Sequence, residues 1–506
     1  MRTKKIALNL ISDILPYIFI GIVGLIKVNV LIHYIGDVGN GYYQLINQII
    51  TYVFLAQAGF GEAVIYKLYK PFAEKNKHDI NRIYSGSRKI FKIIGFIILG
   101  LIILVSLFLY LFYGFKDGYR NSALLCFIII SSSYLISYFG RGQTYMSVLS
   151  AAQEKYIYSI TTNIIKLICD ISIILVAIKF GTLEAIAILI LFVKIIEEII
   201  LRVVVRKKYG WLKEIADKDT SMTKMVKDLA WLQIGYVVLN NVDAVLLGVF
   251  IGPVMVSIYT SYNFILRYLN EISSRVEMSA VYSFGNVFAK KEDNRIKSLY
   301  NEFFVLFIII AFSLSITFMF GIRSFVNIWI GKGNYILSYF TIILFTLTLF
   351  SNIIYYPLLA LINADGLFKD NKKHTFICAS INVILSIILV IPLKINGILL
   401  ATVIAFVVNI FLKTKLVSNK ILKIKHFELL KKYILALLIF IFIAIIGFKI
   451  EFYLYSLSLN LFTCILLLGT IFALIFAITT LLMYLFNKNT KELLKRFNLL
   501  LKRKIG

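Results

Sequence analysis

Three charged residues stand four positions apart within an otherwise apolar stretch: Arg267, Glu271 and Arg275. In a helix this spacing places them on one face, where opposite charges one turn apart can pair. Two guanidinium groups against one carboxylate leave a surplus positive charge, which would belong to groups that face a substrate cavity. Glu277 would not balance it, because it falls about 160 degrees round the helix from Arg275. The alternative interpretation is a set of structural ion pairs.

The composition predicts what surrounds these charges. Hydrophobic residues make up 60% of the 506 positions and charged residues 16%, with a mean hydropathy of +0.87. Apolar runs of about 18 to 25 residues recur along the chain, each long enough to cross a hydrocarbon core about 30 Å thick as a helix. We therefore expect an all-α polytopic membrane protein without a large soluble domain.

About fourteen transmembrane helices are predicted from these runs. They cover residues 9–33, 42–66, 90–113, 122–146, 157–179, 182–205, 229–251, 256–282, 302–328, 335–363, 374–393, 396–414, 432–449 and 459–486.

Lysines and arginines gather in alternate connections, such as 67–92 and 206–227, whereas the connections 34–41 and 252–256 carry few or none. By the positive-inside rule this alternation places both termini in the cytoplasm. The net charge of +28 is therefore a topology signal that also favours anionic membrane lipids, and nucleic acid is not an expected partner.

The chain repeats itself at an offset of 216 residues, so that "IGDVGNGYYQLINQIITY" from Ile35 aligns with "IGPVMVSIYTSYNFILRY" from Ile251. Six spans separate the copies, which predicts two six-helix pseudo-repeats of the same orientation around a central cleft, as in alternating-access transporters. The alternative is a duplication kept only for packing. The expected domains are an N-terminal lobe (1–205), a cytoplasmic linker (206–228), a C-terminal lobe (229–414) and an extra helix pair with a basic cytoplasmic tail (415–506).

Charges deep in the membrane are expected to face a cavity or a partner, because each costs about 2.5 to 3.5 kcal/mol near the bilayer centre. Arg267 would lie about 15 Å inside the outer end of its span. Lys27 and Asp243 occupy equivalent positions in the two copies, and they could meet across the cleft near the outer side. Alternatively, Lys27 extends to the interface and Asp243 bonds its neighbours Asn240 and Asn241.

Other intramembrane charges allow simpler interpretations. Asp13 and Glu62 are candidates for ion coupling, since an intramembrane carboxylate can bind and release a proton. Both lie near cytoplasmic ends. Arg323, near the outer face, is expected to meet lipid phosphate. Two pairs at four-residue spacing, Lys166 with Asp170 and Lys194 with Glu198, read as self-neutralising pairs within one helix.

Enzyme motifs are absent from the sequence, which has four scattered histidines and neither a glycine-rich phosphate loop nor a nucleophile arrangement. Its four cysteines lie in apolar runs without metal-ligand spacing. We therefore expect a protein that is not an enzyme and that needs neither a cofactor nor a metal.

The chain resembles the polysaccharide flippases of the multidrug/oligosaccharidyl-lipid/polysaccharide (MOP) superfamily. The resemblance rests on the two six-span halves with an extra pair, on "IGDVGNGYYQLINQ" entering the second span, on "QAGFGEAVIYKLYK" leaving it and on "SVLSAAQEKY" ending the fourth. It implies a MATE-like fold in a bacterial cytoplasmic (inner) membrane.

The same resemblance implies a flippase that moves undecaprenyl-diphosphate-linked oligosaccharide repeat units outward for capsule or O-antigen assembly. Its partners would be the lipid-linked oligosaccharide, membrane lipids and the polysaccharide polymerase machinery. Arg267 and Arg275 would hold the diphosphate, and Glu271 would limit the cavity's positive charge. The alternatives within the superfamily are a cation-coupled multidrug extruder, which the arginine surplus disfavours, and a lipid II flippase.

Overall fold

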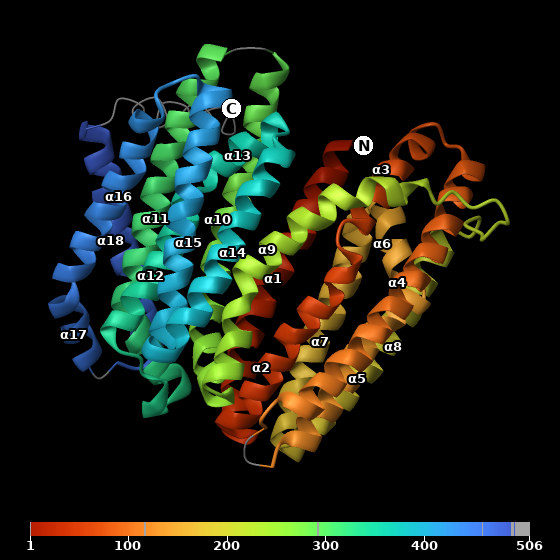
Figure 1. The fold of residues 1–506 in the computed structure, drawn as a ribbon, viewed down its shortest axis with the longest axis horizontal. Coiled ribbons are helices and arrows are strands. Elements are labelled where there is room, and N and C mark those ends of the chain that lie inside the picture. The colour runs from red at the N-terminus through yellow and green to blue at the C-terminus, as the bar shows by residue number, and fades with distance from the viewer. Residues whose placement is uncertain (1, 116–117, 291–292, 458, 487–489, 491–506) are drawn as a thin grey trace. The chain divides into compact units, whose positions relative to one another are not determined.

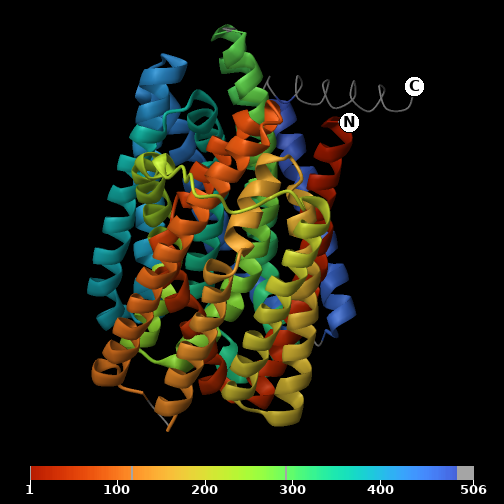
Figure 2. The same ribbon diagram turned by 90° about the vertical axis from the view of Figure 1, so that its right-hand side faces the viewer.

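The computed structural model describes residues 2–115, 118–290, 293–457, 459–486 and 490, and every regular element in this part of the chain is a helix (Figure 1). Figure 2 shows the same helices after a quarter turn, running along one common direction within each part of the chain. By its internal contacts the chain divides into two compact units, residues 1–258 and 259–506.

Unit 1 consists of long helices together with two shorter ones, α3 and α6, each of which continues a broken span. α1 packs along α7, and α5 packs along both α4 and α8. The helices are α1 (Arg2–Tyr34), α2 (Gly36–Val53), α3 (Phe60–Ala73), α4 (Lys77–Phe112), α5 (Arg120–Phe139), α6 (Gly142–Ala151), α7 (Lys155–Phe180), α8 (Leu183–Lys208) and α9 (Val226–Phe250).

Unit 2 is built around α12 and α13, which are buried over 72% of their apolar window, whereas α18 lies at the periphery and is buried over only 6%. α14 packs along α15, and α11 contacts both α12 and α18. The helices are α10 (Pro253–Ala289, whose first turn belongs to unit 1), α11 (Asp293–Ile330), α12 (Tyr339–Ile354), α13 (Tyr356–Asp365), α14 (Phe368–Leu393), α15 (Ile395–Val417), α16 (His426–Ile446), α17 (Phe448–Ser456) and α18 (Leu461–Phe486).

Each of the fourteen predicted spans falls on a long helix or on a pair of consecutive helices. Among the described residues, nine spans are both long and apolar enough to cross a membrane, and the bent pair α2–α3 makes ten. The remaining predicted spans fall on α7 to α10, which have 25 to 37 residues each and carry the internal charges. The count of fourteen crossings and the cytoplasmic position of both termini stay predictions.

Three predicted spans are broken where the sequence interrupts helical geometry. The second bends by 43° between α2 and α3, where Gly59 adopts a left-handed conformation with φ of 80°. The fourth breaks at Gly140, between α5 and α6. The tenth breaks at Tyr355, and Pro357 follows in the first turn of α13, where a missing N–H costs nothing.

The two copies of the repeated turn contact each other within unit 1. The side chain of Asn40 in α2 donates a hydrogen bond of 2.6 Å to Ser257 Oγ in the first turn of α10. Gly41 is required here, because a Cβ at this position would lie 1.9 Å from the carbonyl oxygen of Pro253. The backbones of α2 and α10 can therefore approach closely at their first turns.

Large apolar side chains remain exposed along the outer faces of both units. Ile391 is 72% exposed, Phe427 71% and Phe462 70%. Contiguous apolar surface of this extent is typical of proteins that lie in hydrocarbon rather than in water. This distribution agrees with a multi-pass membrane protein.

Candidate functional site

The charged row predicted from the sequence lies along α10. Arg267 follows the start of the helix by fourteen residues, about 21 Å at 1.5 Å per residue. Arg275 donates to Glu271 Oε1 from Nη2 at 2.7 Å and from Nε at 3.1 Å, and the two side chains are 35% and 38% exposed. Arg267 is exposed. The predicted pairing between Glu271 and Arg275 is confirmed, and both side chains remain open to a ligand.

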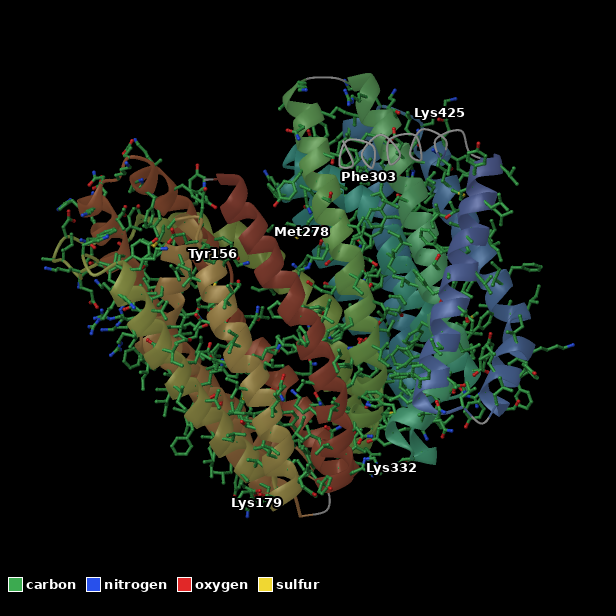
Figure 3. All side chains as sticks on the ribbon, turned by 180° about the vertical axis from the view of Figure 1, so that it is seen from behind. Tyr156, Lys179, Met278, Phe303, Lys332 and Lys425 are labelled. Atoms are coloured by element: carbon green, nitrogen blue, oxygen red, sulfur yellow. The ribbon has the colours of Figure 1, made fainter. Side chains whose placement is uncertain are left out.

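The exposed face of α10 continues beyond the charges with apolar side chains. Met278 is 50% exposed and Tyr282 70%. Figure 3 labels Met278 on this helix. The face therefore combines guanidinium groups, a carboxylate and apolar side chains, which suits a ligand with both anionic and apolar parts.

The opposite face of α10 carries a second set of charges, buried within unit 2, that the sequence analysis missed. Glu277 is 7% exposed and accepts a hydrogen bond of 3.3 Å from Asn363 Nδ2 of α13. Lys413 of α15 is 3% exposed, interacts electrostatically with Glu277 and lies 4.7 Å from the ring centre of Tyr355. Glu277 is thus used inside the unit and does not neutralise the exposed row.

A signal for Lys413 is present in the sequence. Lys413 lies next to the end of the predicted span 396–414, and no role was predicted for it. The structure continues α15 to Val417 and buries Asn409 as well, at 2% exposure, one turn before Lys413. Two polar residues four apart at the end of an apolar run are the pattern that could have found them.

In unit 1, Lys27 of α1 is paired with Asp170 of α7. The distance from Lys27 Nζ to Asp170 Oδ1 is 2.5 Å, with side-chain exposures of 17% and 7%. Asp243 of α9 is buried at 5% exposure and takes part in other interactions. The repeat suggested that Lys27 contacts Asp243. Lys27 pairs with Asp170 instead, because the Asp170 carboxylate lies nearer to the Lys27 ammonium group.

The two predicted pairs within single helices of unit 1 have different outcomes. Asp170 interacts electrostatically with Lys166, as predicted, but its ion pair is with Lys27 of another helix. Lys194 binds Glu197 rather than Glu198, at 2.7 Å, and lies 5.0 Å from the ring centre of Tyr134. A neighbouring helix supplied the closer partner of Asp170, whereas Lys194 pairs three residues along its own helix.

Glu198 instead holds the break between α5 and α6. Its carboxylate accepts the backbone N–H groups of Arg141 at 2.5 Å and Gly142 at 3.0 Å. These are donors that the start of a helix leaves without a partner. A Cβ at Gly140 would lie 2.5 Å from the Glu198 carboxyl group, so the glycine makes room for the carboxylate.

Arg323 is not directed to lipid phosphate in the structure. It binds Glu451 of α17 at 3.1 Å, and the Glu451 side chain is 1% exposed. The expectation was wrong because the sequence did not indicate where the extra C-terminal helices pack. In the structure α17 lies against α11 and brings Glu451 to Arg323.

The ion-coupling candidates are only partly described. The Asp13 side chain lies outside the described side chains. Glu62 is exposed in the first turn of α3, where its negative charge is favourable at the helix N-terminus. Among the described residues, no cluster of three or more His, Cys, Asp or Glu side chains could hold a metal ion.

The linker that follows α8 is tied to the ends of the unit 1 helices. Glu214 lies 3.5 Å from Arg88 and 3.3 Å from Arg141, and Asp217 binds Arg82 at 2.9 Å. Partial burial opposes ionisation of Asp219, but hydrogen bonds from the hydroxyl and amide of Ser221 outweigh it and hold the pKa of Asp219 below its usual value. The acidic side chains of the linker thus neutralise arginines of α4 and of the α5–α6 break.

The family model described as "Polysaccharide biosynthesis protein" matches residues 6–282, more than half of the chain. No curated protein matches the sequence. Similar solved structures include "Lipid II flippase MurJ, inward closed conformation", at 18% identity and a TM-score of 0.69 over 93% of this chain and 98% of that one.

Two further solved structures share the fold at lower identity. The "inward-facing conformation of a multidrug resistance MATE family transporter of the MOP superfamily" matches at 12% identity and a TM-score of 0.65, over 78% of this chain and 94% of that one. The "crystal structure of MATE in complex with MaL6" matches at 12% identity and a TM-score of 0.56, over 82% and 96%. At these identities the likeness concerns the fold alone.

Proposed function

Because the chain belongs to the polysaccharide biosynthesis protein family, we propose that it is a flippase for undecaprenyl-diphosphate-linked oligosaccharide repeat units. It would move them across the bacterial cytoplasmic membrane by alternating access, for the assembly of a surface polysaccharide. The polymerase that joins the repeat units would be a downstream partner. The shared fold with MOP transporters supports the transport part of this proposal.

The observation that carries the choice of substrate is the exposed row on α10. Two arginines and one glutamate stand along about 12 Å of one helix face, with a net charge of one positive unit. Charged side chains on membrane helices often mark the path of a charged substrate. A diphosphate supplies acceptor oxygens for both guanidinium groups. Hydrogen bonds between two charged groups are stronger than hydrogen bonds between neutral groups.

Glu271 sets the strength of this binding. It occupies two donors of Arg275 in the structure. A diphosphate must replace the carboxylate at Arg275, so part of the gain from binding is offset by the loss of that pair. Moderate affinity is useful to a transporter, since the substrate has to leave on the other side of the membrane.

The remaining predicted residues fit this proposal in supporting roles. Asp13 and Glu62 would bind the coupling cation or proton near the cytoplasmic side. Lys27 and Asp243 would contribute to the substrate path, Lys27 with Asp170 as its resting partner. The domains proposed are the two six-helix lobes, 1–205 and 229–414.

A lipid II flippase is the second candidate, because the MurJ structure matches over 93% of this chain. Its substrate also carries a diphosphate, so the α10 row suits both and only the sugar part distinguishes them. A multidrug extruder is disfavoured, since organic cations require carboxylates and aromatic faces rather than surplus arginine.

The test is binding of an undecaprenyl-diphosphate-linked sugar to the purified protein, compared with lipid II and with an organic cation. We expect Arg267→Gln and Arg275→Gln each to weaken binding about 10- to 150-fold, which corresponds to about 1.5–3 kcal/mol for a charge-assisted hydrogen bond. Arg206→Gln, on the exposed last turn of α8, is the matched control and should bind as the unmodified protein does.

The outcomes separate the candidates. Tighter binding of lipid II than of the oligosaccharide lipid would move the assignment to the second candidate. Binding of the organic cation that neither arginine substitution weakens would contradict a flippase for anionic lipids altogether.

A further inference from the structure

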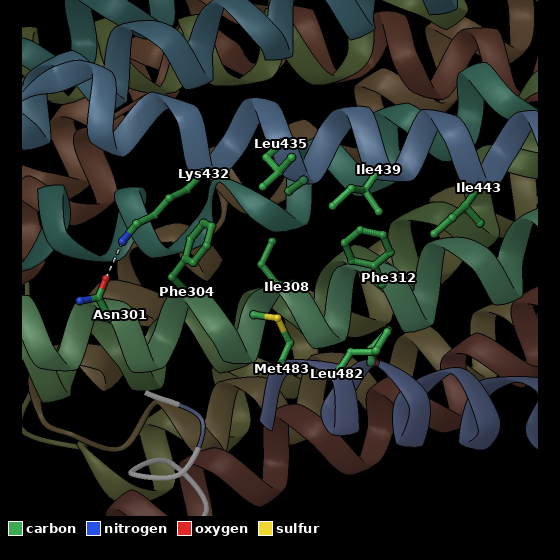
Figure 4. Close-up of a pocket in the computed structure, with 12 residues that line it drawn as sticks. Asn301, Phe304, Ile308, Phe312, Lys432, Leu435, Ile439, Ile443, Leu482 and Met483 are labelled. Carbon is green, nitrogen blue, oxygen red and sulfur yellow. Dashed lines mark hydrogen bonds between the residues drawn. The ribbon is translucent and has the colours of Figure 1, made fainter. Parts of the chain in front are cut away.

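A groove on unit 2 runs between α11, α16 and α18, and nothing in the proposed transport mechanism uses it. Its volume is about 470 Å³ (Figure 4). Apolar side chains of the three helices form its walls, and polar side chains stand at one end. The apolar wall consists of Phe304, Ile308 and Phe312 of α11, Leu435, Ala436, Ile439 and Ile443 of α16, and Leu482 and Met483 of α18.

The groove lies away from the point where α11 and α18 touch. A Cβ at Gly321 of α11 would lie 1.9 Å from Leu468 of α18, so the two helices are in contact there. Nearby, the ion pair of Arg323 with Glu451 joins α11 to α17. From α18 the groove is lined by Thr479, Leu482 and Met483, and the end of the groove that carries Lys432 and Asn301 is called its open end.

At the open end, Lys432 is held in a fixed position. Its Nζ donates a hydrogen bond of 3.0 Å to Asn301 Oδ1 and lies 5.9 Å from the ring centre of Phe304. The neighbouring residues Tyr300 and Tyr433 are fully buried, and their hydroxyl groups are 2.7 Å apart. This buried bond joins α11 to α16 directly beside the pair of Lys432 and Asn301.

The donors at this end suit a phosphate group. The ammonium of Lys432 uses one hydrogen on Asn301 and has two more, and the Asn301 amide nitrogen adds further donors. Two acidic residues lie near this end in the chain: Glu302, next to Asn301, is buried and accepts a hydrogen bond from Ser298, and Glu428, one turn before Lys432, is exposed. The connection before α16 contributes more lysines, Lys423 and Lys425, and both are exposed; Figure 3 labels Lys425.

The length of the groove distinguishes among lipids. From Lys432 to Ile443, α16 rises about 16 Å, which is about half of a hydrocarbon core of 30 Å. One acyl chain of a phospholipid spans one leaflet, whereas an undecaprenyl chain is far longer than a leaflet is thick. The basic connections place this end of α16 at the cytoplasmic leaflet, where anionic lipids are enriched.

We infer that this groove is a binding site for one anionic phospholipid of the cytoplasmic leaflet, with its phosphate on Lys432 and Asn301 and one acyl chain along α11, α16 and α18. Acyl chains gain little by leaving other acyl chains, because lipid is as apolar as the groove. The preference for an anionic lipid therefore depends on Lys432. The segment after α18 is a poor alternative occupant, since residues 487–506 carry seven lysines and arginines and one glutamate.

The test is native mass spectrometry of the purified protein with phosphatidylglycerol, phosphatidylcholine or undecaprenyl phosphate as the added lipid. We expect the protein to retain phosphatidylglycerol in preference to phosphatidylcholine. Lys432→Gln should reduce this preference about fivefold, which corresponds to about 1 kcal/mol for one lysine near an anionic surface. Lys431→Gln is the matched control, because Lys431 is exposed beside Lys432 and does not line the groove.

Two further variants fill the groove from different walls. Ile439→Trp and Leu482→Trp should each remove the retained phosphatidylglycerol, and both positions are exposed enough, at 44% and 48%, for the protein to fold. Unchanged retention in all three groove variants would overturn the inference. Retention of undecaprenyl phosphate that Ile439→Trp and Leu482→Trp abolish would also overturn it, because that lipid would then occupy the groove. These measurements need no transport and leave the proposed function untouched either way.

Discussion

In unit 1, Asp170 of α7 binds the ammonium of Lys27 on α1, whereas on α10 of unit 2 Glu271 binds Arg275 of its own helix. The first pair joins two helices and is mostly buried. The second joins neighbouring turns of one helix and is more than one third exposed. A buried pair between helices fixes packing, while an exposed pair within a helix contributes little to stability and remains open to exchange.

The largest effect is expected from breaking the buried pair. Asp170→Leu leaves the Lys27 ammonium without its carboxylate, and a buried charge deprived of its partner costs about 3–5 kcal/mol. The free energy of unfolding in detergent, measured by denaturant titration, should fall by this amount. The double variant Lys27→Met/Asp170→Leu should regain most of the loss. If the double variant were no more stable than the single one, the pair would not be the cause.

Glu198 offers a second carboxylate of unit 1 whose partners lie on another helix. Glu198→Ala leaves the N–H groups of Arg141 and Gly142 at the start of α6 without an acceptor. Loss of an N-terminal cap costs about 0.5–2 kcal/mol, so the same titration should show a smaller decrease than for Asp170→Leu. Glu184→Ala, in the first turn of α8, provides a control on the same helix. An equal decrease in the control would mean that the loss does not come from the contacts at the α5–α6 break.

The smallest effect on stability is expected for the exposed pair. Glu271→Gln removes a pair one turn apart, which contributes about 0.3–0.5 kcal/mol to a helix. The Glu271→Gln variant should bind an undecaprenyl-diphosphate sugar more tightly than the unmodified protein, because the carboxylate that competes for Arg275 is removed. A decrease in stability as large as that of Asp170→Leu would remove the distinction between the two regions.

The elements were predictable from the sequence because the signal for each lies within the element itself. All fourteen expected spans fall on helices, and the four-residue spacing of Glu271 and Arg275 correctly predicted their pair. The breaks at Gly59 and Tyr355 were missed, since the spans were predicted from the length and hydropathy of the apolar runs, which do not register the glycine or the nearby Pro357.

The partners of the other charges were not predictable from spacing. Asp170 has Lys166 one turn away in its own helix, and Arg323 stands near a surface rich in lipid phosphate. The structure gives them Lys27 and Glu451, which lie 143 and 128 positions away in the chain. The burial of Lys413 was not predictable for the same reason, because only the contact of α15 with its neighbours shows that its last turns are buried.

The sequence by itself determined that this chain forms long apolar helices in a repeated order and that α10 carries an arginine-rich row, because hydropathy and helical period act between residues close together in the chain. Only the tertiary structure decided which charges are buried by packing and which stay exposed. That choice depends on the distance between side chains of different helices, and no local pattern contains it.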